Sequence, residues 1–353
     1  MSKLILLAPL LFFPGCASAP KVAEVWPGSY LIVLEKDAAQ AVVVEPNGGF
    51  VKHVFATETG PHEVCVSRNG QYAVIANYGD GTVRGHTLSV FDLVEERRER
   101  LIDLAPHERP HGIAFLDRRS TVLVTSETSN AVLEVDLRSG KVTRAIPTGA
   151  ELSHMLALSP DKKRAYTSNA GSGSISVLDL EQGTLAHVVE MGTRPEAIDV
   201  APNGEIWVGD NEENKVVVID PVSLKVIAVI HDLRLPIRLA VAPDGSLVAV
   251  SCAATGEIAL IDARTKNVAT RIPLERSDAP SASLPPMFEP GSPVPVGILI
   301  DPDSRYAFVS LAAADRVAVI DLEERRVRTT IAAPGGPDGL AWAFRRAPPS
   351  RSW

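Results

Sequence analysis

The stretch from Ser153 to Pro195, SHMLALSPDKKRAYTSNAGSGSISVLDLEQGTLAHVVEMGTRP, reads as one unit of four short strands. We expect these strands at Met155 to Leu158, Arg164 to Ser168, Ile175 to Leu180 and Leu185 to Glu190. Each run is rich in branched residues and is bounded by Gly, Pro, Asp or Asn, which favour turns. A single sheet of this kind cannot bury both of its faces. It therefore needs copies of itself on either side.

Copies of this unit occur along the chain. Related openings of the first strand begin at Pro61, Pro110, Ser153, Pro195, Pro236, Pro295 and Pro337. The third strand repeats as AVVVEP, LSVFDL, AVLEVDL, ISVLDL, VVVIDP, IALIDA and VAVIDL, beginning at Ala41, Leu88, Ala131, Ile175, Val216, Ile258 and Val317. A period of about 42 residues with four strands in each repeat predicts a β-propeller.

The two ends of the repeat are out of phase. The third strand at Ala41 has no opening before it, and the opening at Pro337 has no strands after it. We therefore expect the C-terminal segment to supply the inner strand of the blade formed by Tyr30 to Thr57, which closes the ring and removes free sheet edges. The prediction is an all-β, seven-bladed propeller of four-stranded antiparallel blades over residues 28–344, followed by a disordered tail at 345–353.

The repeats resemble the YVTN family of bacterial β-propellers. RAYTSN at Arg164, PDG at Pro243, and VLDL, VIDP and VIDL at Val177, Val218 and Val319 carry this resemblance. It implies a seven-bladed propeller like those of lactonase-like hydrolases and of the haem domain of nitrite reductases. Because one fold serves several chemistries, the resemblance leaves the activity open.

The composition is that of a globular protein, with 45% hydrophobic and 22% charged residues and a net charge of -8. This acidic balance argues against a nucleic-acid partner, since phosphate binding draws on clustered basic residues. We expect a monomer. Cys65 and Cys252 fall in blades that are not neighbours, so no disulfide is expected between them.

Residues 1–15, MSKLILLAPLLFFPG, have one basic residue and then a short apolar run, as in a signal peptide. FPGC resembles the lipobox of a bacterial lipoprotein, which implies acylation of Cys16 and a tether over residues 16–27. We therefore expect an exported protein of the periplasm or outer membrane, whose partner is the membrane through its lipid anchor. The alternative is a soluble secreted protein cleaved after Ala19.

One column of the repeat gathers residues that can carry chemistry. The residue directly after each opening lies where the inner strand begins, close to the axis. In blade order this column reads Asp338, His62, His111, His154, Glu196, Ile237 and Val296. Converging imidazoles and carboxylates suit zinc, copper, iron, nickel or manganese. His62, His111, His154 and Glu196 are the predicted metal ligands.

A second column lies at the end of the second strands and reads Glu35, Asn77, Ser126, Asn169, Asp210, Cys252 and Leu311. We expect Glu35, Asn77, Asn169 and Asp210 to orient the imidazoles or to hold a ligand from behind. Insertions at residues 78–87 and 276–293 are expected on the same face, where His86 and His107 are further candidate ligands or proton shuttles.

The same columns fit two other interpretations of the site, a metal-free ligand pocket and a purely structural column, because a His after Pro can simply cap a strand. The sequence has no GxSxG elbow and no phosphate-binding loop, and without CxxCH a covalent haem is excluded.

Three functions remain in view. The first is a scaffold at the cell envelope that binds a metal, a small ligand or another envelope protein. The second is a metal-dependent hydrolase or lactonase-like enzyme, in which the imidazoles activate water and Glu196 or Asp338 acts as base. The third is a protein-interaction platform without a small-molecule site.

Overall fold

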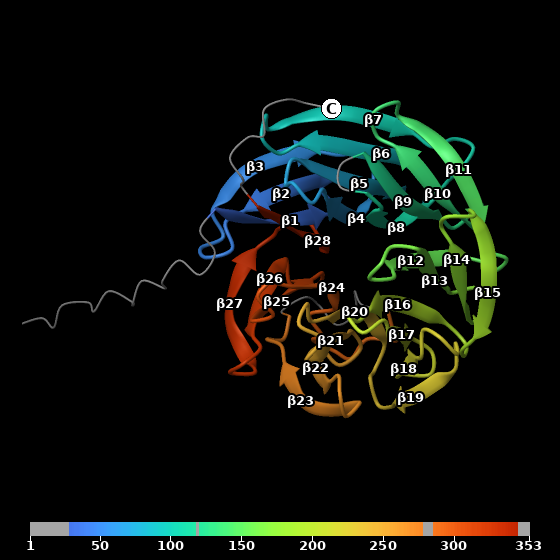
Figure 1. Ribbon diagram of the computed structural model, residues 1–353. Coiled ribbons are helices and arrows are strands. Elements are labelled where there is room, and N and C mark those ends of the chain that lie inside the picture. The colour runs from blue at the N-terminus through green and yellow to red at the C-terminus, as the bar shows by residue number, and fades with distance from the viewer. Residues whose placement is uncertain (1–27, 118–119, 278–284, 345–353) are drawn as a thin grey trace, which may run out of the picture.

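The computed structural model describes residues 28–117, 120–277 and 285–344. In these residues the chain forms a ring of seven four-stranded antiparallel sheets (Figure 1), so the predicted seven-bladed propeller is confirmed. The expected signal peptide, Cys16, the tether and the C-terminal tail lie outside the described residues. Among those described, no helix has the length and apolarity needed to cross a membrane.

The strands are grouped here by their place in a blade, from the axis outward. The inner strands are β28 (Pro337–Phe344), β4 (Pro61–Val66), β8 (Pro110–Phe115), β12 (Ser153–Leu158), β16 (Pro195–Val200), β20 (Pro236–Val241) and β24 (Pro295–Ile300). The second strands are β1 (Ser29–Glu35), β5 (Tyr72–Gly79), β9 (Thr121–Ser126), β13 (Arg164–Asn169), β17 (Ile206–Asp210), β21 (Leu247–Cys252) and β25 (Tyr306–Leu311). The third strands are β2 (Gln40–Val44), β6 (Arg84–Asp92), β10 (Ala131–Asp136), β14 (Ser174–Asp179), β18 (Lys215–Ile219), β22 (Glu257–Asp262) and β26 (Arg316–Asp321). The outer strands are β3 (Val51–Ala56), β7 (Arg97–Asp103), β11 (Lys141–Pro147), β15 (Thr184–Glu190), β19 (Val226–Ile230), β23 (Asn267–Pro273) and β27 (Arg326–Ala332).

The ring closes as the sequence predicts. The C-terminal strand β28 pairs antiparallel with β1, with Ser29 opposite Phe344 and Val33 opposite Leu340. In Figure 1 this pairing places the red end of the described chain beside its blue beginning. The first blade is therefore built from both ends of the propeller, in the order β28-β1-β2-β3.

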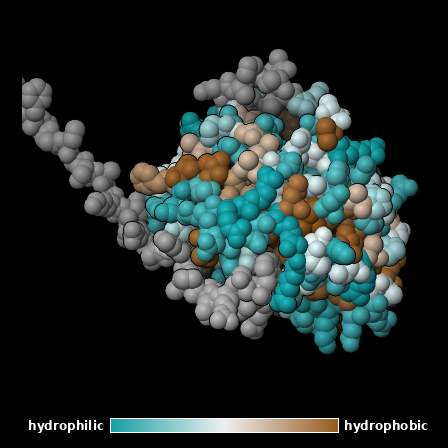
Figure 2. Space-filling view, turned by 90° about the horizontal axis from the view of Figure 1, so that it is seen from above, coloured by the Kyte–Doolittle hydropathy of each residue, from teal (hydrophilic) through white to brown (hydrophobic). Residues whose placement is uncertain are grey.

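The hydrophobic core lies between neighbouring sheets. Second and third strands such as β13 and β14 are buried along nearly their whole length, whereas an outer strand such as β15 is mostly exposed. Branched apolar side chains on both faces of a middle strand suit a sheet that is covered on both sides. On the rim, hydrophobic and hydrophilic residues are mixed over the surface seen in Figure 2.

Two features at the start of the inner strands bring neighbouring blades close together. The strand register shifts there, for example between Pro110 and Ile113 in β8, and such irregularities re-aim a side chain. Glycine permits the close approach, because a Cβ at Gly112 would lie 2.5 Å from the Leu156 nitrogen. His111 lies within the shifted segment of β8, between Pro110 and Ile113, and close to the neighbouring blades.

The insertion at residues 78–87 lengthens the hairpin of the second blade, in which β5 continues to Gly79 and β6 begins at Arg84. The insertion at residues 276–293 is described only in part, because residues 278–284 lie outside the described ranges.

A candidate metal centre at the start of the inner strands

The three predicted imidazoles meet near the axis. His62, His111 and His154 come from β4, β8 and β12 of successive blades, and their ring centroids are 4.3 Å apart for His62 and His111 and 3.8 Å apart for His111 and His154. The His111 side chain is completely buried. The column read from the sequence therefore forms one contiguous group of side chains.

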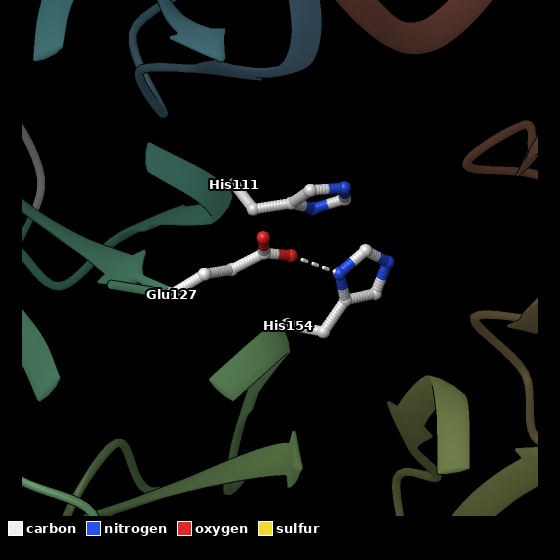
Figure 3. A group of neighbouring side chains, drawn as sticks. All are labelled: His111, Glu127 and His154. Atoms are coloured by element: carbon white, nitrogen blue, oxygen red, sulfur yellow. Dashed lines mark hydrogen bonds and ion pairs between the residues drawn. The ribbon is translucent and has the colours of Figure 1, made fainter. Parts of the chain in front are cut away.

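The tightest group of possible metal ligands is His111, Glu127 and His154 (Figure 3). Each offers one ligand atom, and these atoms all lie within 4.8 Å of one another. Glu127 directly follows β9 and reaches back toward both rings. Glu127 was not among the predicted ligands, because the second column takes the preceding residue, Ser126, from this blade.

His154 lies between two carboxylates. Its Nδ1 is 2.5 Å from Oε1 of Glu127, and its Nε2 is 3.2 Å from Oε1 of Glu196. Burial alone lowers the pKa of the His154 imidazole, but hydrogen bonds to Glu127 and Glu196 outweigh burial and raise it overall. Burial likewise raises the pKa of Glu196, but His154 and then Arg238 overcome this effect and lower it to about 2. The two carboxylates therefore favour the protonated form of the His154 imidazole, and this imidazole favours the ionised form of Glu196.

His111 is the opposite case. Neither of its ring nitrogens has a hydrogen-bond partner. Burial, followed by the charges of His154 and His62, holds the pKa of His111 well below its usual value, so the ring is neutral. A buried polar group without a partner costs about 1–3 kcal/mol. His111 is thus a neutral imidazole whose unprotonated nitrogen can act as a metal ligand.

The other oxygen of Glu127 is also held. The Tyr78 hydroxyl donates a hydrogen bond of 2.7 Å to its Oε2. Burial raises the pKa of the Glu127 carboxyl, but the hydrogen bond and charge of His154 and the hydrogen bond of Tyr78 lower it overall. Glu127 is therefore an ionised carboxylate with a fixed orientation.

His62 forms a separate pair with Asp338, with 2.7 Å between Nδ1 and Oδ2, and Lys36 approaches the same oxygen at 3.5 Å. Burial raises the pKa of Asp338, but the charge and hydrogen bond of His62 outweigh burial and hold it well below its usual range. Of the four predicted ligands, the structure thus places His111 and His154 in the tight group. It places His62 beside that group, and Glu196 behind His154 on the side away from Glu127.

On two of the inner strands, β4 and β20, the residue that follows the column is charged, and these two residues form an ion pair close to the imidazoles. Arg238 of β20 reaches Glu63 of β4, with Nε and Nη2 at 3.1 and 2.9 Å from Oε1. Its Nη1 also lies 3.8 Å from Oε1 of Glu196, while Asn211 donates to Oε2 of Glu196 at 2.8 Å. Glu196 is therefore fixed from several sides and keeps His154 in place.

A cavity of about 220 Å³ is lined in part by His62 and Glu196, the residues next to the tight group. Its polar wall includes Lys36, His62, Glu196, Arg238 and Asp338, and its apolar wall includes Ile237, Val296 and Ala312. The cavity lies over the two blades in which both columns become apolar. It has room for a small ligand beside the imidazoles.

The predicted supporting residues behave differently from the expectation. Asn77 donates to Thr87 and Ser89, and Asn169 donates to Ser174 and Ser176, so both amides hold strands of their own blades together. These two asparagines therefore stabilise blades, and no hydrogen bond described for them reaches an imidazole.

The two acidic members of that column also serve their own blades. Asp210 accepts backbone N–H groups of the adjacent turns, including those of Thr193 and Glu213, and Glu35 accepts from Gln40. Their described hydrogen bonds likewise do not extend to the imidazoles. Glu35 and Asp210 therefore brace turns and strand ends.

The remaining candidates also lie apart from the imidazole group. His86 pairs with Asp103, and His107 pairs with Ser129, each at 2.8 Å. Cys65 and Cys252 are free thiols, as expected. The candidate metal ligands thus lie at the start of the inner strands and at Glu127, which follows β9.

Residues 35–223, more than half of the chain, match the family model described as "Lactonase, 7-bladed beta-propeller". The chain therefore belongs to this family of lactonase-type seven-bladed propellers, as the YVTN-like repeats implied. The matched range contains His62, His111, Glu127, His154 and Glu196.

A curated relative and a solved structure are similar to parts of the chain. Antigen Lp49 of Leptospira interrogans serogroup Icterohaemorrhagiae serovar copenhageni (strain Fiocruz L1-130) is 24% identical over 165 residues, which cover 42% of this chain and 35% of the relative. The chain thus spans about a third of that relative's length. A chain of the Kuenenia stuttgartiensis hydrazine synthase superposes with a TM-score of 0.64 at 18% identity, covering 81% of this chain and 96% of that one. This likeness supports the fold alone.

Proposed function

We propose that this protein is a metal-binding propeller that holds a divalent transition metal ion at His111, Glu127 and His154. The observation that carries the proposal is the complete burial of His111 with both ring nitrogens unpartnered, beside a carboxylate and a second imidazole. Imidazole nitrogen and carboxylate oxygen are ligands of zinc and of its transition-metal neighbours. Three such ligands leave a fourth position for an exogenous group.

The spacing of the three donors suits an ion after small movements. Tetrahedral zinc with bonds of about 2.0–2.1 Å separates its ligand atoms by about 3.4 Å. The candidate atoms lie within 4.8 Å of one another, and the Glu127–His154 contact of 2.5 Å must open. Movements of about 1 Å by these side chains would therefore bring the three ligand atoms to the distances that zinc requires.

The surroundings of the ligands also support a metal. The His154 Nδ1 faces Glu127, while its Nε2 faces the carboxylate of Glu196. A carboxylate behind a ligating His fixes the ring and its tautomer, and the hydroxyl of Tyr78 fixes Glu127 in a comparable way. Glu196 is therefore proposed to orient His154 rather than to bind the metal directly.

The charge of the site favours an added cation. Arg238 and Glu63 neutralise one another, which leaves Glu127, Glu196 and Asp338 around the imidazoles. Arg238 also lies 3.8 Å from Glu196, but it is already paired with Glu63. The other cations, Lys36 and Arg194, approach Asp338 and Glu196 at 3.5 and 4.0 Å and have side chains that are 36% and 50% exposed. A divalent ion at this position would supply positive charge next to the three carboxylates.

The experiment is metal binding by the purified protein after dialysis against a chelator, measured by calorimetry with Zn²⁺ and by the absorption spectrum of Co²⁺. Wild type is expected to bind one ion. Glu127→Gln keeps the shape of the side chain and is expected to lose about 100-fold in affinity or more.

The matched control is His62→Gln, in the same ring of histidines but outside the tight group, and it is expected to retain binding. No binding by wild type, or equal loss in both variants, contradicts the proposal.

A second function, a metal-assisted hydrolase of the lactonase type, is favoured by the family and by the cavity that His62 and Glu196 line. A bound metal would polarise an ester or lactone carbonyl. With its pKa lowered to about 2, Glu196 is a weak base. In this alternative it therefore orients His154, and Asp338 orients His62. Hydrolysis of lactones and esters by the metal-loaded protein, but not by Glu127→Gln, would support the hydrolase function. If the metal-loaded protein is inactive, the metal-binding scaffold is the function that remains.

For location, we propose export and anchoring through an acylated Cys16, on the strength of the apolar run and FPGC pattern at residues 1–16. The cavity would then serve a small ligand or another envelope protein. Incorporation of labelled palmitate into wild type but not into Cys16→Ser tests this. Labelling of neither, with the protein free in the culture medium, favours the secreted alternative.

A further inference from the structure

Tyr78 lies at the base of the lengthened hairpin, one residue past the column of Asn77. Its backbone is fixed, because the Tyr78 nitrogen donates to the Gly60 carbonyl at 2.9 Å. The next residue, Gly79, has a φ of 89°, and a Cβ there would lie 2.1 Å from the Val83 carbonyl oxygen. Only glycine suits this position, so the turn sets where the Tyr78 side chain begins.

The ring of Tyr78 packs between the imidazoles and a guanidinium. Its centroid lies 5.2 Å from that of His62 and 5.4 Å from that of His111. Arg109 covers the ring at 4.6 Å and is itself held by donating to the Asp80 carbonyl at 2.8 Å. Cation–π packing of this kind contributes about 0.5–2 kcal/mol. The ring is therefore fixed between the proposed metal centre and the inserted hairpin.

The hydroxyl of Tyr78 has one partner in the described structure, Oε2 of Glu127 at 2.7 Å, while Oε1 of the same carboxylate faces His154. The two oxygens of Glu127 are thus distinguished by their partners. A phenol hydroxyl is protonated at neutral pH, so Tyr78 is the donor in this hydrogen bond.

We infer that Tyr78 is the positioning residue of the metal centre, whose hydroxyl restrains Glu127 so that a single carboxylate oxygen is presented to the ion. This inference rests on the proposed function. The hairpin insertion thereby gains a role in the site. Among the described blades, only this one is lengthened between its second and third strands. Loss of such an orienting partner typically weakens metal affinity about 10- to 100-fold.

The test compares Tyr78→Phe with Tyr306→Phe. Each change removes one hydroxyl that forms a partly buried hydrogen bond with a charged side chain, because the Tyr306 hydroxyl accepts from Arg328 at 2.6 Å in another blade. Affinity for Zn²⁺ and the Co²⁺ absorption spectrum are measured for both. We expect Tyr78→Phe to bind Zn²⁺ at least about 10-fold more weakly and to alter the Co²⁺ spectrum, with Tyr306→Phe like wild type in both respects.

The failures of the two proposals are distinguishable. If wild type binds no metal, the proposed function fails and this inference fails with it. If wild type binds and Tyr78→Phe matches it in affinity and spectrum, only the inference fails. Equal weakening in Tyr78→Phe and Tyr306→Phe shows a general loss of stability and also overturns the positioning role.

Discussion

Arg238 and Glu63 form an ion pair between inner strands of non-adjacent blades, with 2.9 Å between Nη2 and Oε1, although they are 175 positions apart in the chain. Both side chains are largely buried, at 9% and 16% exposure. Glu63 follows His62 in β4, and Arg238 follows Ile237 in β20. The ion pair therefore connects two sides of the ring close to the imidazoles.

Removing one partner of this pair should destabilise the propeller strongly. Arg238→Met leaves Glu63 buried without its counter-charge and removes a neighbour of Glu196, and such losses cost about 3–5 kcal/mol. The double variant Arg238→Met/Glu63→Gln should recover part of this loss. Denaturant unfolding gives both free energies, and an additive double variant would show that the two side chains act independently.

Gly112 should not tolerate a side chain. In Gly112→Ala the new Cβ meets the Leu156 nitrogen at 2.5 Å and Met155 backbone atoms at 2.9 Å, which pushes β8 and β12 apart. We expect a loss of about 1–3 kcal/mol of stability and weaker metal binding, since His111 and His154 lie on these strands. Gly81→Ala is the control, because a Cβ added at Gly81 would have no atom within 4 Å. Equal behaviour of the two variants would contradict the close approach of the strands.

The carboxyl of Asp199 should make stability depend on pH. It accepts the Val241 and Val200 N–H groups at 2.8 Å, yet burial outweighs these bonds and raises its pKa from 3.8 to about 6. The folded state therefore keeps this proton longer than the unfolded state does. Its stabilising contribution is present below pH 4 and is lost as the pH rises through 6.

Between pH 4 and 7, the unfolding free energy of Asp199→Asn should fall less than that of wild type. The difference between the two falls should be about 2–3 kcal/mol at most. Denaturant titrations at each pH give the difference between the two curves. Parallel curves for wild type and variant would exclude this residue as the source.

Both described cysteines should react slowly in the folded protein. Burial raises the pKa of the Cys252 thiol to about 12 and also raises that of Cys65, so few thiolates are present at neutral pH. In a Cys16→Ser variant, we expect a thiol reagent to label the native protein at least about 100-fold more slowly than the unfolded protein. Rapid native labelling of Cys252 would restore it as a candidate functional thiol.

The repeats predicted the ring, its closure and the convergence of three imidazoles, because period and strand order fix which residues begin the inner strands. Glu127 was missed because it lies one residue past the strand. Its equivalents in three other blades are Lys36, Tyr78 and Asn211, which contact Asp338, Glu127 and Glu196 respectively, while the remaining three blades have alanine at this position. That polar column was a signal in the sequence.

Other features depend on side-chain direction, which repeat alignment does not determine. Asn77 and Asn169 face strands of their own blades, and Glu196 takes the outer nitrogen of His154. The contact of Arg238 with Glu63 requires knowing that a long side chain extends between non-adjacent blades. Such choices are settled by packing within and between blades.

Asp338, the partner of His62, is carried by β28, the last strand of the propeller to be synthesised. A nascent chain therefore has its histidines long before it has the carboxylate that holds the first of them. Completion of the first blade and completion of this ion pair are one event, so a partly translated propeller lacks both at once.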